Sequence, residues 1–340
     1  MVDVEVTACS DPEAWDRCVD RTSYATAFHR YDALRALADH SGTRLLALVA
    51  REGTEPVGAF PLFVGSLGPF TTVVSPPTSL EVPALGPLRL DHVDCSQRKA
   101  EHRNRALVES SLDWVDERVD PDLLDVRAVD RYVDTRPFDW LGFDVEPSYT
   151  YVVDLDPGVD ALWSAASGDL RTNVRSADEV AHEVRVGGRE DVQRVVEQVA
   201  RRFERQGLSY GLSVEAALDL GDALPEGCLT PYVCTVEGEF AGGLLTVRYG
   251  DTVAAWQGGA RPDVDVPVND VLDWHCLEEA VADGYDRYEL VGAMEPHLCE
   301  YKAKFGPRPA VVPLVRRTSR RFEAAASVYD HLPRGLRAVV

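Results

Sequence analysis

Lysine is the rarest charged residue in this chain, and its distribution points to chemistry. The 340 residues contain three lysines and 32 arginines, and two of the lysines, Lys302 and Lys304, lie in the segment 301–306. A compact ammonium fits beside the oxygen that becomes negative during acyl transfer, where a flat guanidinium fits poorly. We therefore predict that Lys302 stabilises such an oxyanion and that Lys304 is a further binding residue. An ordinary surface lysine beside a turn is the alternative interpretation.

Arg171 and Arg175 are a second candidate pair. They are four residues apart, so both project from the same face of a helix. Two guanidinium groups on one face bind phosphate or carboxylate groups in a bidentate manner, which predicts a substrate-binding role. The alternative is that they form ion pairs with Asp169, Asp178 or Glu179 on the helix surface.

Glu289 is a candidate general base. It lies in an apolar segment, 286–293, that we expect to be a strand. A carboxyl group buried there with a raised pKa would accept a proton at neutral pH, whereas a surface carboxylate at a strand end would do nothing of the kind. His297 and Cys299 are close together in the sequence but have no distant partner, so we predict no metal site.

The composition indicates the setting of this chemistry. The formal net charge is −22, with 33 aspartates and 24 glutamates. An acidic surface with almost no lysine suits a cytosol of molar salt, so we expect an extreme halophile as the host. The seven cysteines include no C-x-x-C pair, the N-terminus has no signal-peptide pattern, and no apolar run is long enough to cross a membrane. These features predict a cytoplasmic protein with free thiols and no integral membrane segment.

The elements that must position these residues occur in a similar order in the two halves of the chain. A hairpin at 43–65, a helix at 98–118 and a strand at 123–129 make up the first half, with a long loop expected at 66–95. Three antiparallel strands at 230–259, a helix at 269–284 and the strand at 286–293 make up the second. Both helices contain Leu-Asp-Trp, at 112–114 and 272–274. The repeated order suggests an internal duplication.

The segment 251–306 resembles FemAB-like transferases of the GNAT acyltransferase superfamily, and the composition suggests a haloarchaeal-type member. The resemblance rests on AAWQGGARPD, VNDVLDWHCLEEAVADG, YDRYELVGA and LCEYKAKFGPRP, and on 171-RTNVRSADEV-180, and it extends over about 155–315. It implies an α/β fold of two tandem GNAT-like domains, each with a mixed, mostly antiparallel sheet flanked by helices. We expect a degenerate N-terminal domain at 1–150, a transferase domain at 151–315 and a basic tail at 316–340.

The resemblance also implies an activity, which is transfer of an acyl or aminoacyl group to an amine. In this family the first lysine of the 301–306 element, here Lys302, is thought to stabilise the tetrahedral intermediate or to contact substrate. Tyr301 stands where the family has Phe, and Glu289 where it usually has Asp. The turn Gln257-Gly258-Gly259 corresponds to the acyl-CoA cradle but lacks its usual Gly at the fourth position. We place Tyr301 and the three turn residues among the substrate-binding candidates.

The donor and the acceptor stay open at this point. An acyl-CoA or an aminoacyl-tRNA would serve as donor co-substrate, no permanently bound cofactor is implied, and tRNA is a potential partner. The acceptor would be a small molecule, a peptide or an amino sugar, and the oligomeric state is not predicted. The alternative function is a non-catalytic ligand-binding protein on the GNAT fold, because a fold does not fix its chemistry.

Overall fold

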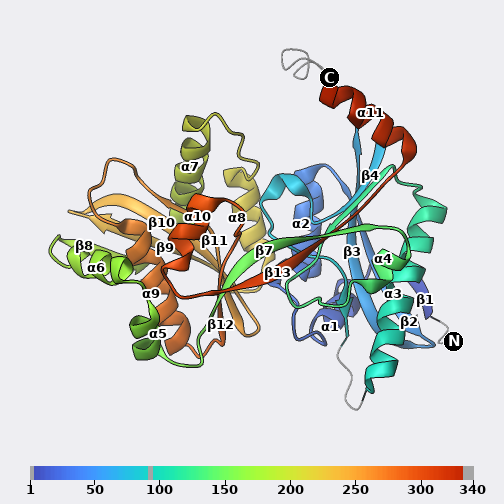
Figure 1. Cartoon of the computed structure of the whole chain (residues 1–340), viewed down its shortest axis with the longest axis horizontal. Coiled ribbons are helices and arrows are strands. Elements are labelled where there is room, and N and C mark those ends of the chain that lie inside the picture. The colour runs from blue at the N-terminus through green and yellow to red at the C-terminus, as the bar shows by residue number, and fades with distance from the viewer. Residues whose placement is uncertain (1–3, 91–94, 332–340) are drawn as a thin grey trace.

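The computed structural model describes residues 4–90 and 95–331, and its strands form one continuous sheet (Figure 1). The order of the strands across this 13-stranded sheet is β1-β2-β3-β4-β6-β13-β7-β12-β11-β10-β9-β8, with β5 paired to β3. Most neighbouring strands are antiparallel, and helices flank the sheet. The mixed, mostly antiparallel α/β architecture predicted from the sequence is confirmed.

The first half of the chain builds one side of the sheet. Its strands are β1 (Val4–Ala8), β2 (Arg44–Glu52), β3 (Glu55–Leu67), β4 (Phe70–Ser75), β5 (Leu88–Arg89) and β6 (Leu123–Arg127). Its helices are α1 (Pro12–Val19), α2 (Tyr31–Ser41), α3 (Gln97–Arg118) and α4 (Arg136–Trp140), with a short 3-10 helix, η1, at Ala27–His29. Asp11 caps α1, and Gly42, with φ +65°, ends α2 in the left-handed conformation that glycine adopts readily.

The second half builds the other side. Its strands are β8 (His182–Val186), β9 (Leu229–Val236), β10 (Glu239–Tyr249), β11 (Thr252–Ala260) and β12 (Arg287–Leu290). Its helices are α5 (Val159–Ala165), α6 (Gly168–Ala177), α7 (Arg189–Arg205), α8 (Val214–Ala223), α9 (Val268–Ala282) and α10 (Pro296–Ala303). In each half a hairpin is followed by a strand, a helix and a strand parallel to the preceding one: β4 with β6, and β11 with β12.

The two halves are joined by an exchange of their last strands. β7 (Asp144–Asp154) follows the first half but pairs with β12 of the second, and β13 (Arg308–Thr318) follows the second half but pairs with β6 of the first. β7 and β13 also pair with each other at the centre of the sheet. Residues 316–318 therefore lie in the sheet, followed by α11 (Arg320–His331), and residues 332–340 lie outside the described part. The division at residues 150 and 315 stays a prediction.

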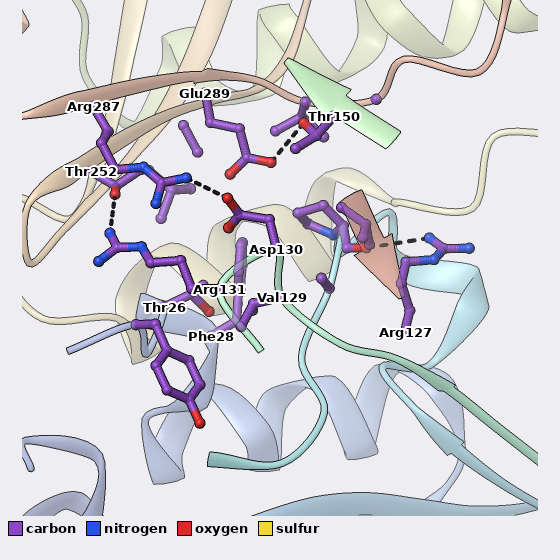
Figure 2. A pocket seen from close by; sticks show the side chains of 18 of the residues that line it. Thr26, Phe28, Arg127, Val129, Asp130, Arg131, Thr150, Thr252, Arg287 and Glu289 are labelled. Atoms are coloured by element: carbon purple, nitrogen blue, oxygen red, sulfur yellow. Dashed lines mark hydrogen bonds and ion pairs between the residues drawn. The ribbon is translucent and has the colours of Figure 1, made fainter. Parts of the chain in front are cut away.

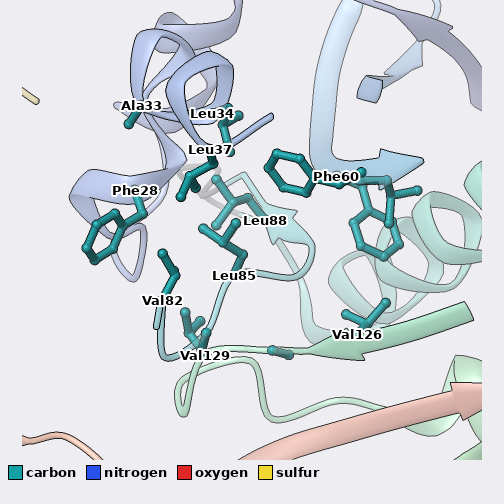
Figure 3. Packing of buried hydrophobic residues seen from close by; sticks show 14 of the residues in the cluster. Phe28, Ala33, Leu34, Leu37, Phe60, Val82, Leu85, Leu88, Val126 and Val129 are labelled. Carbon is teal, nitrogen blue, oxygen red and sulfur yellow. The ribbon is translucent and has the colours of Figure 1, made fainter. Parts of the chain in front are cut away.

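The segment 66–95, expected to be a loop, contains β4 and β5, so this expectation is wrong. Thr71–Val74 are β-branched, and the strand forms because β3 and β6 offer hydrogen-bonding edges on both sides. The chain after β4 is also anchored, because Val82, Leu85 and Leu88 are buried in the core of the first half (Figure 3). Phe28 packs in the same cluster. These buried side chains fix the segments 24–28 and 75–83, which line the two cavities described below.

α7 and α9 cover opposite faces of the second half of the sheet. A Cβ atom on Gly243 would lie 2.3 Å from Val195 of α7, and one on the neighbouring Gly242 would lie 2.8 Å from Val268 of α9. Adjacent strand residues point to opposite faces, so the two helices do as well. The close approach leaves no room for a side chain at either position. No helix among the described residues combines the length and the apolar character needed to span a membrane.

Candidate functional site

The largest cavity near the predicted site opens where two parallel strands diverge. β11 and β12 pair only from Thr252↔Arg287 to Ala255↔Leu290, and β11 then continues to Ala260 paired with β10 alone. The gap leads to a cavity of about 510 Å³, which we call the splay cavity. Its walls come from β11, β12, α9, α10 and the first-half segment 75–83. Residues from both halves thus form one site.

Trp256 marks the point of divergence. The register of β10 and β11 shifts there, so that Leu245 pairs with Gln257 and Thr246 with Ala255. The extra residue of this bulge, Trp256, is directed to the first half, where its indole Nε1 donates to the Glu81 carbonyl at 2.7 Å. Its ring contacts Phe28 edge-to-face, with centroids 5.2 Å apart. The bulge thus coincides with the end of the β11–β12 pairing, and the Trp256 side chain that it presents fastens the two halves together.

Lys302 lies on the wall of the splay cavity. Its Nζ donates to the main-chain carbonyls of Val291 at 2.5 Å and Gly292 at 2.6 Å. Consecutive carbonyls of a regular strand point in opposite directions, but Gly292 has φ +81°, so the chain turns and both oxygens reach one ammonium. Burial lowers the pKa of Lys302, while the nearby Asp273 carboxylate acts in the opposite direction.

Asp273 of α9 is the buried acid of this site. It lines the splay cavity, and only 8% of its surface is exposed. The Tyr301 hydroxyl donates to its Oδ2 at 2.6 Å, and the Tyr288 hydroxyl donates to its Oδ1 at 3.1 Å. Burial raises the pKa of Asp273 to about 6, although both hydrogen bonds favour the carboxylate. Tyr301, predicted to bind substrate, lines the same cavity, but its hydroxyl hydrogen is donated to Asp273.

Gln257, Gly258 and Gly259 all line the splay cavity, and their role in substrate binding stays a prediction. The Gln257 Oε1 accepts from the Tyr210 hydroxyl at 2.9 Å. A Cβ on Gly258 would lie 2.8 Å from the Gly243 carbonyl oxygen, so contact with β10 by itself requires glycine there. A Cβ on Gly259 would instead lie 3.0 Å from Nη1 of Arg202. These glycines bring α7 and β10 close to the cavity.

Three other predicted binding residues do not line this cavity. The Arg171 guanidinium donates to the carbonyls of residues 163, 164 and 166 at the end of α5, and Arg175 stacks over the Trp163 ring at 5.5 Å. Lys304 forms an ion pair with Asp270 at 3.2 Å. In this structure all three hold α5, α6, α9 and α10 together, and the predicted ion pairs of the two arginines with neighbouring helix carboxylates are not among their contacts.

Glu289 lines a second, smaller cavity of about 250 Å³, which we call the junction cavity (Figure 2). It lies between the sheet and the first-half segment 24–28, and it adjoins the splay cavity through three shared lining residues: Pro83, Arg127 and Val291. The Thr150 hydroxyl donates to Glu289 Oε1 at 2.8 Å. Burial, with help from the Asp130 carboxylate, raises the pKa of Glu289 to about 7. Lys302 and Glu289 thus lie on adjoining cavities.

Two arginines of the splay cavity form no ion pair with a carboxylate of the described residues. Arg202 donates to the Gly258 carbonyl at 3.2 Å, and Arg127 donates to the Pro83 carbonyl at 3.4 Å. Burial lowers the pKa of Arg202. By contrast, Arg316 on the same wall is paired with Asp125. In so acidic a chain, two guanidinium groups without carboxylate partners leave this cavity suited to an anion.

Sequence reasoning noted Asp273 only as part of the Leu-Asp-Trp repeat and did not single out Arg127 or Arg202. The signal available for Asp273 was an acid surrounded along the helix by the apolar residues Val271, Leu272, Trp274, Cys276 and Leu277. The corresponding Asp113 of the first half is exposed, so the repeat alone does not distinguish the two. Among the described residues, no cluster of three or more His, Cys, Asp or Glu side chains has the arrangement of a metal site.

Comparisons with known proteins agree with this architecture. Residues 164–303 match the family described as acetyltransferase (GNAT) domain. The structure of FemX is similar over 95% of this chain and 99% of its own, with 13% identity and a TM-score of 0.72. The C-terminal domain of a putative lysylphosphatidylglycerol synthetase from Agrobacterium fabrum covers 94% and 95%, with 14% identity and a TM-score of 0.58.

A tandem GNAT protein from the clavulanic acid biosynthesis pathway is similar over 93% of this chain and 98% of its own, with 14% identity and a TM-score of 0.50. No curated protein sequence matches the chain. At these identities the structural likeness establishes the fold. Residues 164–303 are thus similar to the GNAT acetyltransferase domain, and the chain as a whole has a fold like those of FemX and of a tandem GNAT protein.

Proposed function

We propose that this protein transfers an acyl or aminoacyl group to an amine, with the reaction centred on Lys302. The observation that carries the proposal is the ammonium of Lys302, held by two main-chain carbonyls on the wall of the splay cavity. An ammonium has three N–H donors, so one is left for a ligand. A preorganised donor of this kind stabilises the oxygen that becomes negative when an amine attacks a carbonyl.

The donor would occupy the splay cavity. Both donor classes expected from the sequence, acyl-CoA and aminoacyl-tRNA, carry phosphate groups, and Arg127 and Arg202 supply unpaired guanidinium groups on the cavity wall. Proteins of similar structure include the C-terminal domain of a putative lysylphosphatidylglycerol synthetase and a tandem GNAT protein whose structure was solved without AcCoA. We therefore keep both donors in the proposal, and we place the reaction in the cytoplasm, where both occur.

Asp273 would position other side chains of the site and would not itself react. Its carboxylate fixes the Tyr301 hydroxyl, and Tyr301 immediately precedes Lys302 on α10. The negative charge of Asp273 also favours the charged form of Lys302 against the effect of burial. Asp273 therefore serves as a positioning residue for the ammonium.

A transfer assay tests the proposal. The full-length protein is incubated at high salt with acetyl-CoA, or with a mixture of charged tRNAs, and with an amine panel comprising a lysine peptide, glucosamine and phenethylamine. Mass spectrometry should detect an acylated or aminoacylated amine, and Lys302→Ala should abolish it. Lys99→Ala is the matched control, because this third lysine lies on α3 with its ammonium 3.9 Å from Glu52.

Tight binding of a donor without transfer to any amine would contradict the proposal and favour the non-catalytic ligand-binding alternative. Binding is measured in the same samples by the concentration-dependent rise in melting temperature that a ligand of the native state produces.

A further inference from the structure

The junction cavity has a chemical character of its own. Glu289 and Arg287 of β12 lie on its sheet side, and Phe28, Val129 and Asp130 come from the first half, with Asp130 reaching across to Arg287 (Figure 2). It meets the splay cavity at Val291, whose carbonyl accepts from Lys302, and the next residue, Gly292, lines the junction cavity. A ligand in the junction cavity therefore reaches the neighbourhood of the Lys302 ammonium from the opposite side.

Two charged lining residues of this cavity form no ion pair with a described residue: Glu289 on the sheet side, and Arg127 where the cavity adjoins the splay cavity. Asp130 and Glu289 are its two lining carboxylates. Asp130 pairs with Arg287 at 2.5 Å, whereas Glu289 takes part in no ion pair with a described residue and accepts only from Thr150. Arg131, also on the wall, pairs with Asp251. A partly buried carboxylate that forms no ion pair with a described residue is unfavourable, so the wall at Glu289 is suited to a cation.

The remaining walls are largely apolar and aromatic. They are formed by side chains from both halves: Tyr24, Phe28, Val129, Tyr149, Val247, Tyr249, Met294 and Val312. Aromatic faces attract cations, and apolar walls favour a ligand with a hydrocarbon body. A volume of about 250 Å³ limits that body to a small molecule or to one side chain of a larger one.

We propose that the junction cavity binds a small primary amine with an apolar or aromatic body, its ammonium at Glu289 and its body among the aromatic walls. This inference rests on the proposed function, because it names the class of acceptor for the same reaction. It selects, among the acceptors left open by the sequence, an arylalkyl-type or alkyl-type amine over an amino sugar, whose hydroxyl groups would lose their water contacts against these walls.

The reaction then balances as follows. Glu289 takes one proton from the ammonium, and the free amine attacks the carbonyl carbon of the donor in the splay cavity, forming the C–N bond. The oxyanion forms beside Lys302. Its collapse breaks the C–S bond of a thioester or the C–O bond of an ester. The leaving sulfur or oxygen takes the second proton of the amine, and Glu289 later returns its proton to solvent. The products are an amide and a free thiol or alcohol.

The ionisation of Glu289 is compatible with this role. Burial and the Asp130 carboxylate raise the pKa of Glu289 to about 7, while the Thr150 hydroxyl, Arg287 and Lys302 favour its charged form. The base is active when deprotonated, so kcat/KM should rise with pH up to about 7 and then level. Asp130, Arg287, Lys302 and Thr150 are the groups that determine this titration.

Binding of phenethylamine and of 2-phenylethanol, measured without any donor, tests the inference. The two molecules have nearly the same shape, but only the first carries an ammonium. We expect phenethylamine to bind at least about tenfold more tightly, since a hydrogen bond to a charged group contributes about 1.5–3 kcal/mol. Glu289→Gln should remove this preference, and Thr150→Val should weaken it. Glu183→Gln on the edge strand β8, an exposed carboxylate, should leave it intact.

The outcomes separate the two proposals. Equal binding of the amine and the alcohol, or an unchanged preference in folded Glu289→Gln, overturns the acceptor assignment even if transfer to another amine is found. A Glu289-dependent preference without transfer from any donor supports the cavity's ligand class and contradicts the transferase. Glu289→Asp, which keeps the charge, serves if Glu289→Gln does not fold, and should retain a measurable preference.

Discussion

Replacing Asp273 with Asn should change how the stability of the protein depends on pH. The pKa of Asp273 is about 6 in the folded protein and 3.8 without the protein environment. The native state therefore holds this proton more tightly than the unfolded state does. The stability gained from binding this proton is complete below about pH 3.8 and is lost as the pH rises through about 6. Asp273 is nearly fully buried, so solvent screening is small.

The size of the effect follows from the two pKa values. The loss from full protonation to full ionisation is about 3 kcal/mol, of which about 1.4 kcal/mol falls between pH 5 and pH 8. Asn cannot ionise, and it offers Tyr301 and Tyr288 one carbonyl acceptor in place of two carboxylate oxygens. The free energy of unfolding of the wild type, relative to Asp273→Asn, should therefore fall by about 1.4 kcal/mol between pH 5 and pH 8.

Urea unfolding of both proteins at high salt, followed by tryptophan fluorescence at the two pH values, measures this difference. Other titrating groups are common to the two proteins and cancel. A difference that stays constant with pH, or that increases in favour of the wild type at pH 8, would refute the account of Asp273 as a buried acid with a raised pKa.

Three further perturbations follow from the same contacts. Lys304→Met removes the ammonium that pairs with the buried carboxylate of Asp270. The free energy of unfolding, measured with urea, should fall by about 3 kcal/mol while the affinity for the donor is kept. A fall of only a few tenths of a kcal/mol would contradict this expectation. Arg202→Gln should weaken binding of acetyl-CoA, or of whichever phosphate-bearing donor binds, by about tenfold, and calorimetry showing unchanged affinity would remove Arg202 from the donor site. Gly292→Ala places a side chain at φ +81° and should reduce thermal stability by about 1–2 kcal/mol. It should also slow transfer more than it weakens donor binding, because the two carbonyls that hold Lys302 would move; equal effects on both would contradict this.

Local sequence signals predicted most of the elements. The apolar hairpins and the repeated order of strands and helices were predicted from patterns that each extend over a short segment of the sequence. β4 was missed because its ends are rich in Pro, Gly and Ser, and it is the edges of β3 and β6 that make this short segment a strand. The exchange of β7 and β13 depends on pairing between residues more than 130 positions apart, which no local pattern contains.

The candidate site was predictable in part for the same reason. Lys302 and the Gln257 turn share one cavity, and both lie in the segment 251–306 whose resemblance to a known family singled them out. The environment of Arg171 was not predictable, since its carbonyl partners at the end of α5 depend on how two short helices meet. The role of Asp273 depends on two tyrosines from other elements, β12 and α10, that only folding brings to it.

The transfer rate of Lys302→Ala, measured in a single turnover with saturating donor, tests the central claim most directly. Removing one donor to a developing oxyanion lowers the rate by about 10²–10³, while the Kd of the donor should change by less than about threefold. Lys302→Arg should remain impaired, and Lys99→Ala should match the wild type. A rate within about threefold of the wild type in folded Lys302→Ala would show that this ammonium does not stabilise the transition state.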